Sequence, residues 1–213
     1  MSNQGKLMVV SGFSGVGKGT VIKQLMEENP NFVFSVSGTS RYMREGEVHG
    51  VHYFFLTREE FEEGIREGKF LEHAQFAGNY YGTPRDYVMS QMEQCNNVVL
   101  DIEVQGALQV MDRFEDAKTI YLIAPSAEVL IKRLTGRGTE NTEQIKTRMQ
   151  QAIKETEIIP KYQHILINDT IEETIRNILA VADGAIQSAE DREKAMKIVE
   201  EIRRDLPAII ESL

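Results

Sequence analysis

The sequence predicts an α/β protein built on a doubly wound parallel sheet, and three observations lead to this fold class. Four short apolar runs are each too short for a helix, as is typical of strands buried in a parallel sheet. Longer amphipathic segments separate them, the alternation that winds helices around such a sheet. A glycine-rich turn directly follows the first run, where such sheets bind ligands.

The elements follow this alternation along the chain. The expected strands are Leu7–Val10, Val98–Ile102, Ile120–Ile123 and Ile165–Ile167. The expected helices are Thr20–Glu28, Gln105–Phe114, Ala127–Leu134, Thr142–Glu157 and Thr170–Ala182. Thr57 and Glu60 form a capping box that predicts a further helix, and Thr170 with Glu173 forms a second box. Pro84 is expected to be the first residue of another helix.

Two stretches interrupt the alternation, and such interruptions are expected to carry function. The stretch from Phe32 to Thr83, rich in aromatic, glycine and basic residues, predicts a small lobe inserted after the first helix. The stretch Gly136–Thr142 places an arginine between two glycines. The tail from Ala185 to Leu213 is amphipathic, and we expect its helix to pack on the core or on a second copy of the chain.

Composition excludes several classes of protein. The 213 residues are 41% hydrophobic and 27% charged, with a formal net charge of −9, which is typical of a globular enzyme-sized domain. The acidic balance argues against a nucleic acid polymer as partner, and no apolar run approaches the roughly 18 residues of a membrane span. Cys95 is the single cysteine, so no internal disulfide can form, and we expect a reducing, cytoplasmic compartment.

The glycine-rich turn has the spacing of a phosphate loop. It reads Gly12-Phe13-Ser14-Gly15-Val16-Gly17-Lys18-Gly19-Thr20 between a strand and a helix. Backbone N–H groups at the positive end of a helix can surround a triphosphate, and Lys18 adds a charge on its β and γ phosphates. A turn without chemical role is the alternative. Gly19 stands where the general pattern has Ser or Thr, so Thr20 is the nearest hydroxyl for Mg²⁺.

Asp101 closes the expected strand of residues 98–102, at the strand end where ligands bind in doubly wound sheets. It could lie near Mg²⁺ or near a phosphoryl acceptor. The alternative is a carboxylate that caps the helix beginning near Gln105. On Asp101 alone the two interpretations are equally supported.

Arg41 and Arg44 indicate a second phosphate site, because guanidinium groups bind phosphate oxygens two at a time. Solvated charges on a loop are the alternative. His49 and His52 lie nearby, but two histidines without a third ligand are expected to be plain loop residues rather than a metal site.

These motifs, taken in order, resemble those of guanylate kinase over residues 6–183. The resemblance rests on the phosphate loop, on the Arg41–Arg44 segment with Gly46-Glu47 and Tyr53, on Glu72 and Tyr81 to Thr83, and on Leu100–Gly106, Gly136–Gly138 and Ile167–Asp169. It implies transfer of the γ-phosphoryl group of ATP to GMP, and to dGMP, giving ADP and GDP with Mg²⁺. The alternative is a guanylate-kinase-like binding module without catalysis.

The resemblance also implies an inserted GMP-binding lobe (35–83), a mobile lid (136–149) and a core (5–34, 84–135 and 150–183) within a single domain, followed by a C-terminal helical extension (184–213). The extension could form a homodimer. ATP is expected to bind residues 12–20, Arg133, Arg137 and Asn168. The expected catalytic charges are Lys18, Arg44, Arg137 and Arg148, while Mg²⁺ is carried mainly by the nucleotide phosphates, with Thr20 and Asp101 as candidate contacts.

For GMP, the resemblance implies that Arg41, Arg44, Tyr53 and Tyr81 hold the phosphate and that Asp101, Glu103 and Arg148 contribute to the site. Guanine offers one acceptor and a pair of N–H donor groups, so a hydroxyl beside a carboxylate can read it. Ser37, Thr83 and Glu72 supply these groups, and an ionised glutamate only accepts. A surface carboxylate is the alternative for Glu72.

The chain departs from the family pattern at three places that remove no phosphate ligand. Phe13 replaces the usual proline of the loop, Met43 replaces a proline between the two arginines, and Glu103 replaces an aspartate. Because methionine does not fix φ as proline does, the turn from Arg41 to Arg44 is expected to be less rigid.

Overall fold

The computed structural model describes residues 4–76, 78–136 and 142–212, and its contacts cluster in two compact units. The first unit holds residues up to Val9 together with Glu28–Ala117, and the second holds Val10–Glu27 and Lys118–Leu213. Strand β1 (Leu7–Gly12) therefore contributes its first half to one unit and its second half to the other. The expected single-domain division stays a prediction.

The first unit contains two sheets. In one of them the strand order is β2-β7-β1, with β2 (Phe32–Phe34) parallel to β7 (Asn97–Asp101) and Val33 opposite Val98. The other has the order β4-β3-β6-β5. Its strands are β3 (Gly38–Thr39), β4 (Phe54–Phe55), β5 (Phe70–Phe76) and β6 (Asn79–Pro84). All four lie within or next to the stretch predicted as an inserted lobe.

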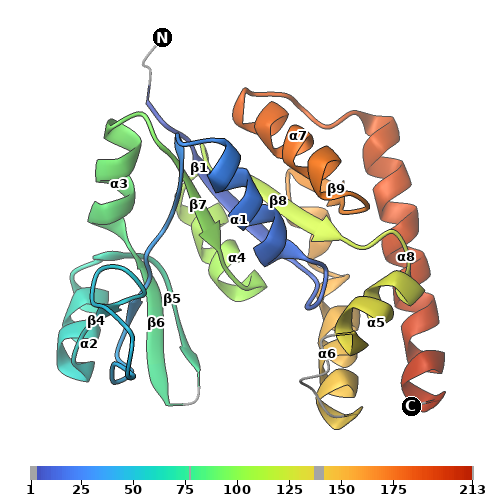
Figure 1. Cartoon of the computed structure of the whole chain (residues 1–213), viewed down its shortest axis with the longest axis horizontal. Coiled ribbons are helices and arrows are strands. Elements are labelled where there is room, and N and C mark those ends of the chain that lie inside the picture. The colour runs from blue at the N-terminus through green and yellow to red at the C-terminus, as the bar shows by residue number, and fades with distance from the viewer. Residues whose placement is uncertain (1–3, 77, 137–141, 213) are drawn as a thin grey trace. The chain divides into compact units, whose positions relative to one another are not determined.

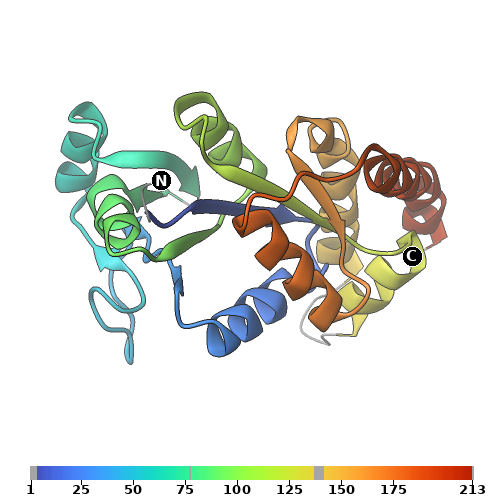
Figure 2. The ribbon, with the colours of Figure 1, turned by 90° about the horizontal axis from the view of Figure 1, so that it is seen from above.

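Helix α2 (Arg58–Arg66) packs against the β5–β6 hairpin, as Figure 2 shows. The ring of Phe61 stacks on Phe70 and Tyr80, with centroids 4.2 and 5.3 Å away. Thr57 accepts a hydrogen bond from the Glu60 N–H at 3.1 Å, and the Glu60 carboxylate accepts from the Thr57 N–H at 2.7 Å. The predicted capping box is therefore confirmed.

Two further helices complete the first unit, α3 (Arg85–Glu93) and α4 (Val104–Arg113). The prediction that Pro84 is the first helical residue was wrong by one position. Pro84 is the N-cap, with an extended backbone at φ −64° and ψ 123°, because it also ends strand β6. The N-cap of α4 is Glu103, so Asp101 is not the capping residue that the alternative interpretation proposed.

The second unit pairs β1 with β8 (Lys118–Ile123) and β8 with β9 (His164–Ile167). Strands β8 and β9 are parallel, with Ile120 opposite His164, and every residue of β8 after Lys118 is buried. The strands alternate with helices, which confirms the predicted α/β class. The helices are α1 (Lys18–Glu28), α5 (Ala127–Thr135), α6 (Thr142–Glu155), a short 3₁₀ turn η1 (Ile159–Lys161), α7 (Ile171–Ala182) and α8 (Ala189–Ser212).

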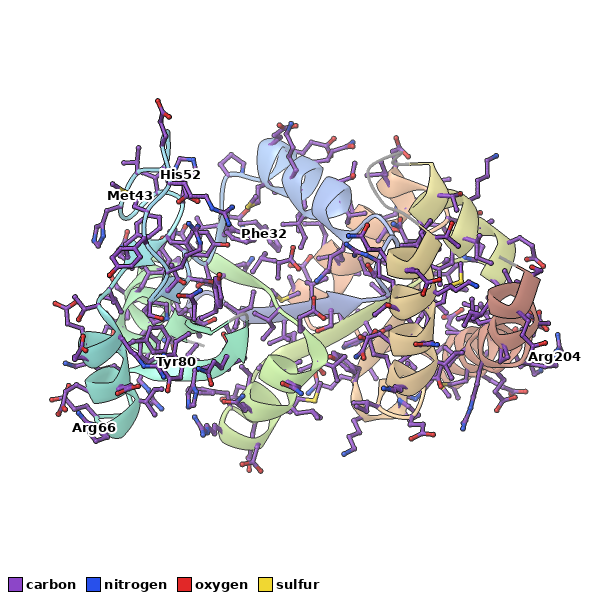
Figure 3. All side chains as sticks on the ribbon, turned by 90° about the horizontal axis from the view of Figure 1, so that it is seen from below. Phe32, Met43, His52, Arg66, Tyr80 and Arg204 are labelled. Carbon is purple, nitrogen blue, oxygen red and sulfur yellow. The ribbon has the colours of Figure 1, made fainter. Side chains whose placement is uncertain are left out.

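Helix α8 packs along α5 and α6 and against β9 (Figure 1). Its buried residues are Ala195, Val199, Ile202 and Leu206, spaced as one face of a helix, while Arg204 projects from the outer face (Figure 3). The expected packing on the core is confirmed, although Ile209 is only half-buried. Among the described residues, no helix is long and apolar enough to cross a membrane.

We predict that Ile202→Ala destabilises the protein by about 2–5 kcal/mol, because the side chain is completely buried and its loss leaves a cavity between α8 and its neighbours. Ile186→Ala is the matched control, since that side chain is 90% exposed just before α8. Urea unfolding followed by circular dichroism measures both. Equal free energies of unfolding for the two variants would contradict the packing of α8.

Candidate functional site

The phosphate loop joins β1 to α1 in the second unit. Gly15 and Gly17 have φ angles of 84° and 97°, in the left-handed region that favours glycine. The Val16 N–H donates to the Phe13 carbonyl at 3.0 Å, and the Thr20 N–H donates to Gly17 at 3.1 Å. Helix α1 begins at Lys18 and has no acidic residue in its first turn. The loop therefore provides the positive helix end that binds phosphate.

The Val16 carbonyl fixes the loop to two other segments. The Arg133 guanidinium on α5 donates to it at 3.0 Å, and the Asn168 side-chain amide, just after β9, donates at 2.8 Å. Arg133 also donates to the Asn168 carbonyl at 2.8 Å, and Thr174 donates to the Asn168 side-chain oxygen at 2.9 Å. Both residues were expected to contact ATP. The structure brings them to the loop, and the ATP contact stays a prediction.

Arg148 on α6 is also brought to the loop. Its guanidinium donates to the Ser14 hydroxyl. Ile145 and Met149 are buried on the same helix, so Arg148 lies beside the apolar stripe as expected. Arg137, the other expected lid arginine, lies outside the described residues.

Four residues of the expected phosphate-binding lobe meet in the first unit. The Arg41 guanidinium lies 5.5 Å from the Tyr53 ring centroid, and the rings of Tyr53 and Tyr81 are 6.1 Å apart. Glu47 receives two hydrogen bonds from Arg41, at 2.7 and 3.0 Å, and one from the Arg44 N–H at 2.7 Å. These bonds, led by that of Arg41, lower the pKa of Glu47 to about 2. The carboxylate therefore stays ionised and orients Arg41.

Sequence reasoning did not assign Glu47 to the site. A signal was present, because the spacing Arg41, Arg44, Glu47 places a carboxylate one short turn beyond two arginines. A loop that bends back on itself brings such residues together, and here Gly46 supplies the bend with a φ of 83°. Arg44 itself is exposed.

The two histidines of this loop order its backbone. His52 accepts from the Val48 N–H at 3.0 Å, and His49 accepts from the Phe55 N–H at 3.2 Å, each through Nδ1. His52 and Met43 both lie in the outer part of the loop (Figure 3). In the part of the chain that the structure describes, no group of three His, Cys, Asp or Glu residues could hold a metal.

Glu72 and Thr83 form a buried pair on adjacent strands, β5 and β6. The Thr83 hydroxyl donates to the Glu72 carboxylate at 2.7 Å, and the two residues are 1% and 6% exposed, respectively. Burial raises the pKa of Glu72, while the bonds from Thr83 oppose the rise. The surface alternative for Glu72 is thus wrong, and its hydroxyl neighbour is the one that the sequence predicted.

Gly106 on α4 gives the Glu72 carboxylate its space. A Cβ at this position would lie 2.6 Å from Glu72 Oε2, closer than real contacts allow. The close approach explains physically why a glycine occupies the first turn of a helix, where it is otherwise unfavourable. The sequence places Gly106 in the Leu100–Gly106 motif, but spacing alone indicates no role for it.

The remaining expected site residues lie on different elements and differ in exposure. Asp101 ends β7 and is exposed, as is Glu103 at the start of α4, whose side chain makes no capping hydrogen bond. Ser37 is half-buried and its carbonyl accepts from the Phe54 N–H at 2.8 Å. Thr20 is exposed on the first turn of α1. Their roles toward nucleotides and Mg²⁺ stay predictions.

Comparison with known proteins places this geometry in a family. The guanylate kinase family model matches residues 4–183. A guanylate kinase of Clostridium perfringens strain SM101 is 44% identical over 180 residues, covering 84% of this chain and 83% of that protein. The enzyme of strain ATCC 13124 is 45% identical over 179 residues, with the same coverage.

A solved structure agrees with these relatives. The crystal structure of guanylate kinase from Anaplasma phagocytophilum superposes with a TM-score of 0.65 at 30% identity, covering 89% of this chain and 90% of that one. With its phosphate loop and its buried carboxylate–hydroxyl pair, this chain belongs to the guanylate kinase family, whose reaction is phosphoryl transfer from ATP to GMP.

Proposed function

We propose that this chain transfers the γ-phosphoryl group of ATP to GMP, and likewise to dGMP, with the phosphate loop holding ATP and the lobe of residues 35–83 holding the acceptor. The observation that carries the choice of acceptor is the buried Glu72–Thr83 pair. The carboxylate accepts from the N1–H and N2–H groups of guanine. Adenine presents a lone pair at N1 instead, which the carboxylate repels.

Catalysis requires the chain to position two phosphates in line and to stabilise charge that spreads over the transferring group. Lys18 and Arg148 supply positive charge at the loop, and Arg137 and Arg44 complete the proposed set. Arg133 and Asn168 hold the loop backbone, while the lid (136–149) excludes water so that ATP is not hydrolysed. No side-chain nucleophile is needed.

The acceptor's phosphate is proposed to bind Arg41, Arg44, Tyr53 and Tyr81. Arg41, Tyr53 and Tyr81 already lie together, and Glu47 is hydrogen-bonded to Arg41. The Glu47 carboxylate keeps Arg41 in a fixed direction before the substrate arrives, so less side-chain entropy is lost on binding. Asp101, Glu103 and Ser37 are proposed as additional acceptor contacts.

The donor set of the chain fits Mg²⁺ that the ATP phosphates carry. Mg²⁺ keeps several waters and takes few protein ligands in such sites. The Thr20 hydroxyl and the Asp101 carboxylate, both exposed, are the proposed protein contacts of the ion. When bound, Mg²⁺ neutralises negative charge on the phosphates.

A non-catalytic binding module of the same fold has less support. Such a module could dispense with the cationic side chains at the loop, yet Lys18 and Arg148 are both present, and Arg148 contacts Ser14. We place the reaction in the cytoplasm. A homodimer through the extension stays a proposal, and it would use residues other than Val199, Ile202 and Leu206, which the chain buries itself.

We predict that Lys18→Met lowers kcat by about 100-fold or more, because charge that develops on the transferring phosphoryl loses a cation. The loop backbone remains, so the melting temperature is expected to stay near that of the wild type. A coupled assay of GMP-dependent ADP release measures the rate. Unchanged turnover would remove Lys18 from the proposed mechanism.

We predict that Glu72→Gln weakens GMP selectively, because an amide accepts less strongly and presents an unwanted donor to the guanine edge. Sites that hydrogen-bond a polar edge can discriminate by about 10⁴-fold. The measurement is kcat/KM for GMP and for AMP. Glu59→Gln, an exposed carboxylate on α2, is the control, and an unaltered ratio in Glu72→Gln would exclude Glu72 from base recognition.

We predict that Gly106→Ala lowers kcat/KM for GMP without unfolding the protein. The added methyl must displace the end of the Glu72 side chain, which is flexible, while alanine favours the helix. Gln105→Ala, at an exposed neighbouring position, is the matched control. If Gly106→Ala keeps the GMP-to-AMP ratio of the wild type, the space beside Glu72 does not govern specificity.

A further inference from the structure

Two adjacent residues of the phosphate loop are each linked to helix α6. Ser14 accepts a hydrogen bond from Arg148, which lies in the middle of that helix. Phe13 is linked to the last residue of the helix, Glu155, through the side chain of Tyr121 on β8. Neither Tyr121 nor Glu155 has a role in the proposed mechanism.

The aromatic part of this link is rigid. The rings of Phe13 and Tyr121 meet edge to face, with centroids 5.3 Å apart and planes at 83°. Tyr121 meets Tyr162 in the same manner, at 5.1 Å and 70°. All three side chains are at most 1% exposed. Edge-to-face packing in a close-packed interior fixes where each ring lies, so Tyr121 holds its hydroxyl in a defined place relative to the loop.

The polar part of the link is directional. The Tyr121 hydroxyl donates to Glu155 Oε2 at 2.6 Å, and the Gln151 amide donates to Oε1 at 3.1 Å. Glu155 is 5% exposed. A buried carboxylate is costly unless it is hydrogen-bonded. Gln151 lies on α6 and moves with it, so the bond from Tyr121 on β8 is the one that resists sliding or rotation of this helix end.

The helix transmits that constraint to Arg148. Glu155 is seven positions after Arg148, which is about two helical turns and about 10 Å along the axis, so both side chains lie on the same side of α6. Met149 and Ala152, buried between them, keep that side against the core. Fixing the position of Glu155 thus sets where Arg148 lies along the axis of α6 and the direction in which its side chain extends toward Ser14.

We propose that Tyr121 and Glu155 are positioning residues for phosphoryl transfer, which act by holding Arg148 at the phosphate loop. The inference rests on the proposed role of Arg148 in catalysis. The same link explains how the loop is restrained at Phe13. The usual proline of the loop restricts the backbone directly, whereas Phe13 is held by its packing on Tyr121.

Tyr121→Phe removes only the hydroxyl and keeps the ring that packs on Phe13. Because a small misplacement of a catalytic group can cost up to about 100-fold in rate, we expect kcat to fall by about 10- to 100-fold. KM for GMP and for ATP should stay unchanged. Glu155→Gln, whose amide oxygen can still accept from Tyr121, should retain more activity than Glu155→Ala.

The decisive measurement is a double-mutant cycle with Arg148→Met. If Tyr121 acts through Arg148, Tyr121→Phe should lower kcat in the wild-type background and have almost no further effect beside Arg148→Met. Thr119→Val is the matched control. This substitution removes a buried hydroxyl from the same strand, β8. That hydroxyl accepts from the Gln163 N–H at 2.9 Å rather than bonding to a side chain of α6.

The outcomes separate the inference from the proposed function. Equal losses of kcat in Tyr121→Phe with and without Arg148 would overturn the inference, as would a loss in Thr119→Val of the same size, because either result indicates a merely structural effect. Full activity in Glu155→Ala would also overturn it. An active wild type whose kcat is insensitive to Arg148→Met would instead refute the proposed role of Arg148.

Discussion

The carbonyl group of Val16 is the point on which the nucleotide site of the second unit depends. A phosphate loop must keep its N–H groups directed inward, and the left-handed residues Gly15 and Gly17 that allow this are of the type whose backbone is intrinsically the least restricted. Arg133 and Asn168 bind that carbonyl from α5 and from the end of β9. A charged donor and a buried amide on one acceptor make a strong, directional attachment. The loop's shape is therefore set by residues more than a hundred positions away in the chain.

An acidic chain that binds two polyanionic substrates must concentrate positive charge locally. In the lobe of residues 35–83, the cluster of positive charge also contains a carboxylate. Glu47 balances one of the two arginines, and the charge that remains is positive. The pair restricts Arg41, whereas Arg44 stays exposed and would be free to follow the substrate in the proposed site. The nearby Tyr53 and Tyr81 offer hydroxyl groups without adding charge, so a phosphate can meet oriented donors while the lobe avoids strong self-repulsion.

Local chemistry made much of this fold predictable. The four expected strands, the capping box at Thr57 and the phosphate loop depend on neighbouring residues, and the structure contains them. The start of α3 was missed by one residue because Pro84 serves both a strand end and a helix cap. Contacts such as Tyr121 with Glu155, or Gly106 with Glu72, join segments more than thirty residues apart. No periodicity or spacing encodes them, since they arise only when tertiary packing brings the segments together.

The buried position of Glu72 is unfavourable for folding, but in the proposed guanine site it would favour discrimination. Burial raises its pKa, which means that the ionised form is less stable there than in water. Thr83 supplies its hydroxyl and its backbone N–H to the carboxylate and thereby preserves part of its tendency to ionise. The oxygen next to Gly106 has no room for a methyl group beside it. A base that brings N–H donors relieves the desolvated carboxylate, whereas a base that brings a lone pair leaves it worse solvated than in the empty site. In the proposed site, selectivity would then arise mainly from the penalty on the wrong base, because leaving a buried polar group unpaired costs more than a formed hydrogen bond contributes.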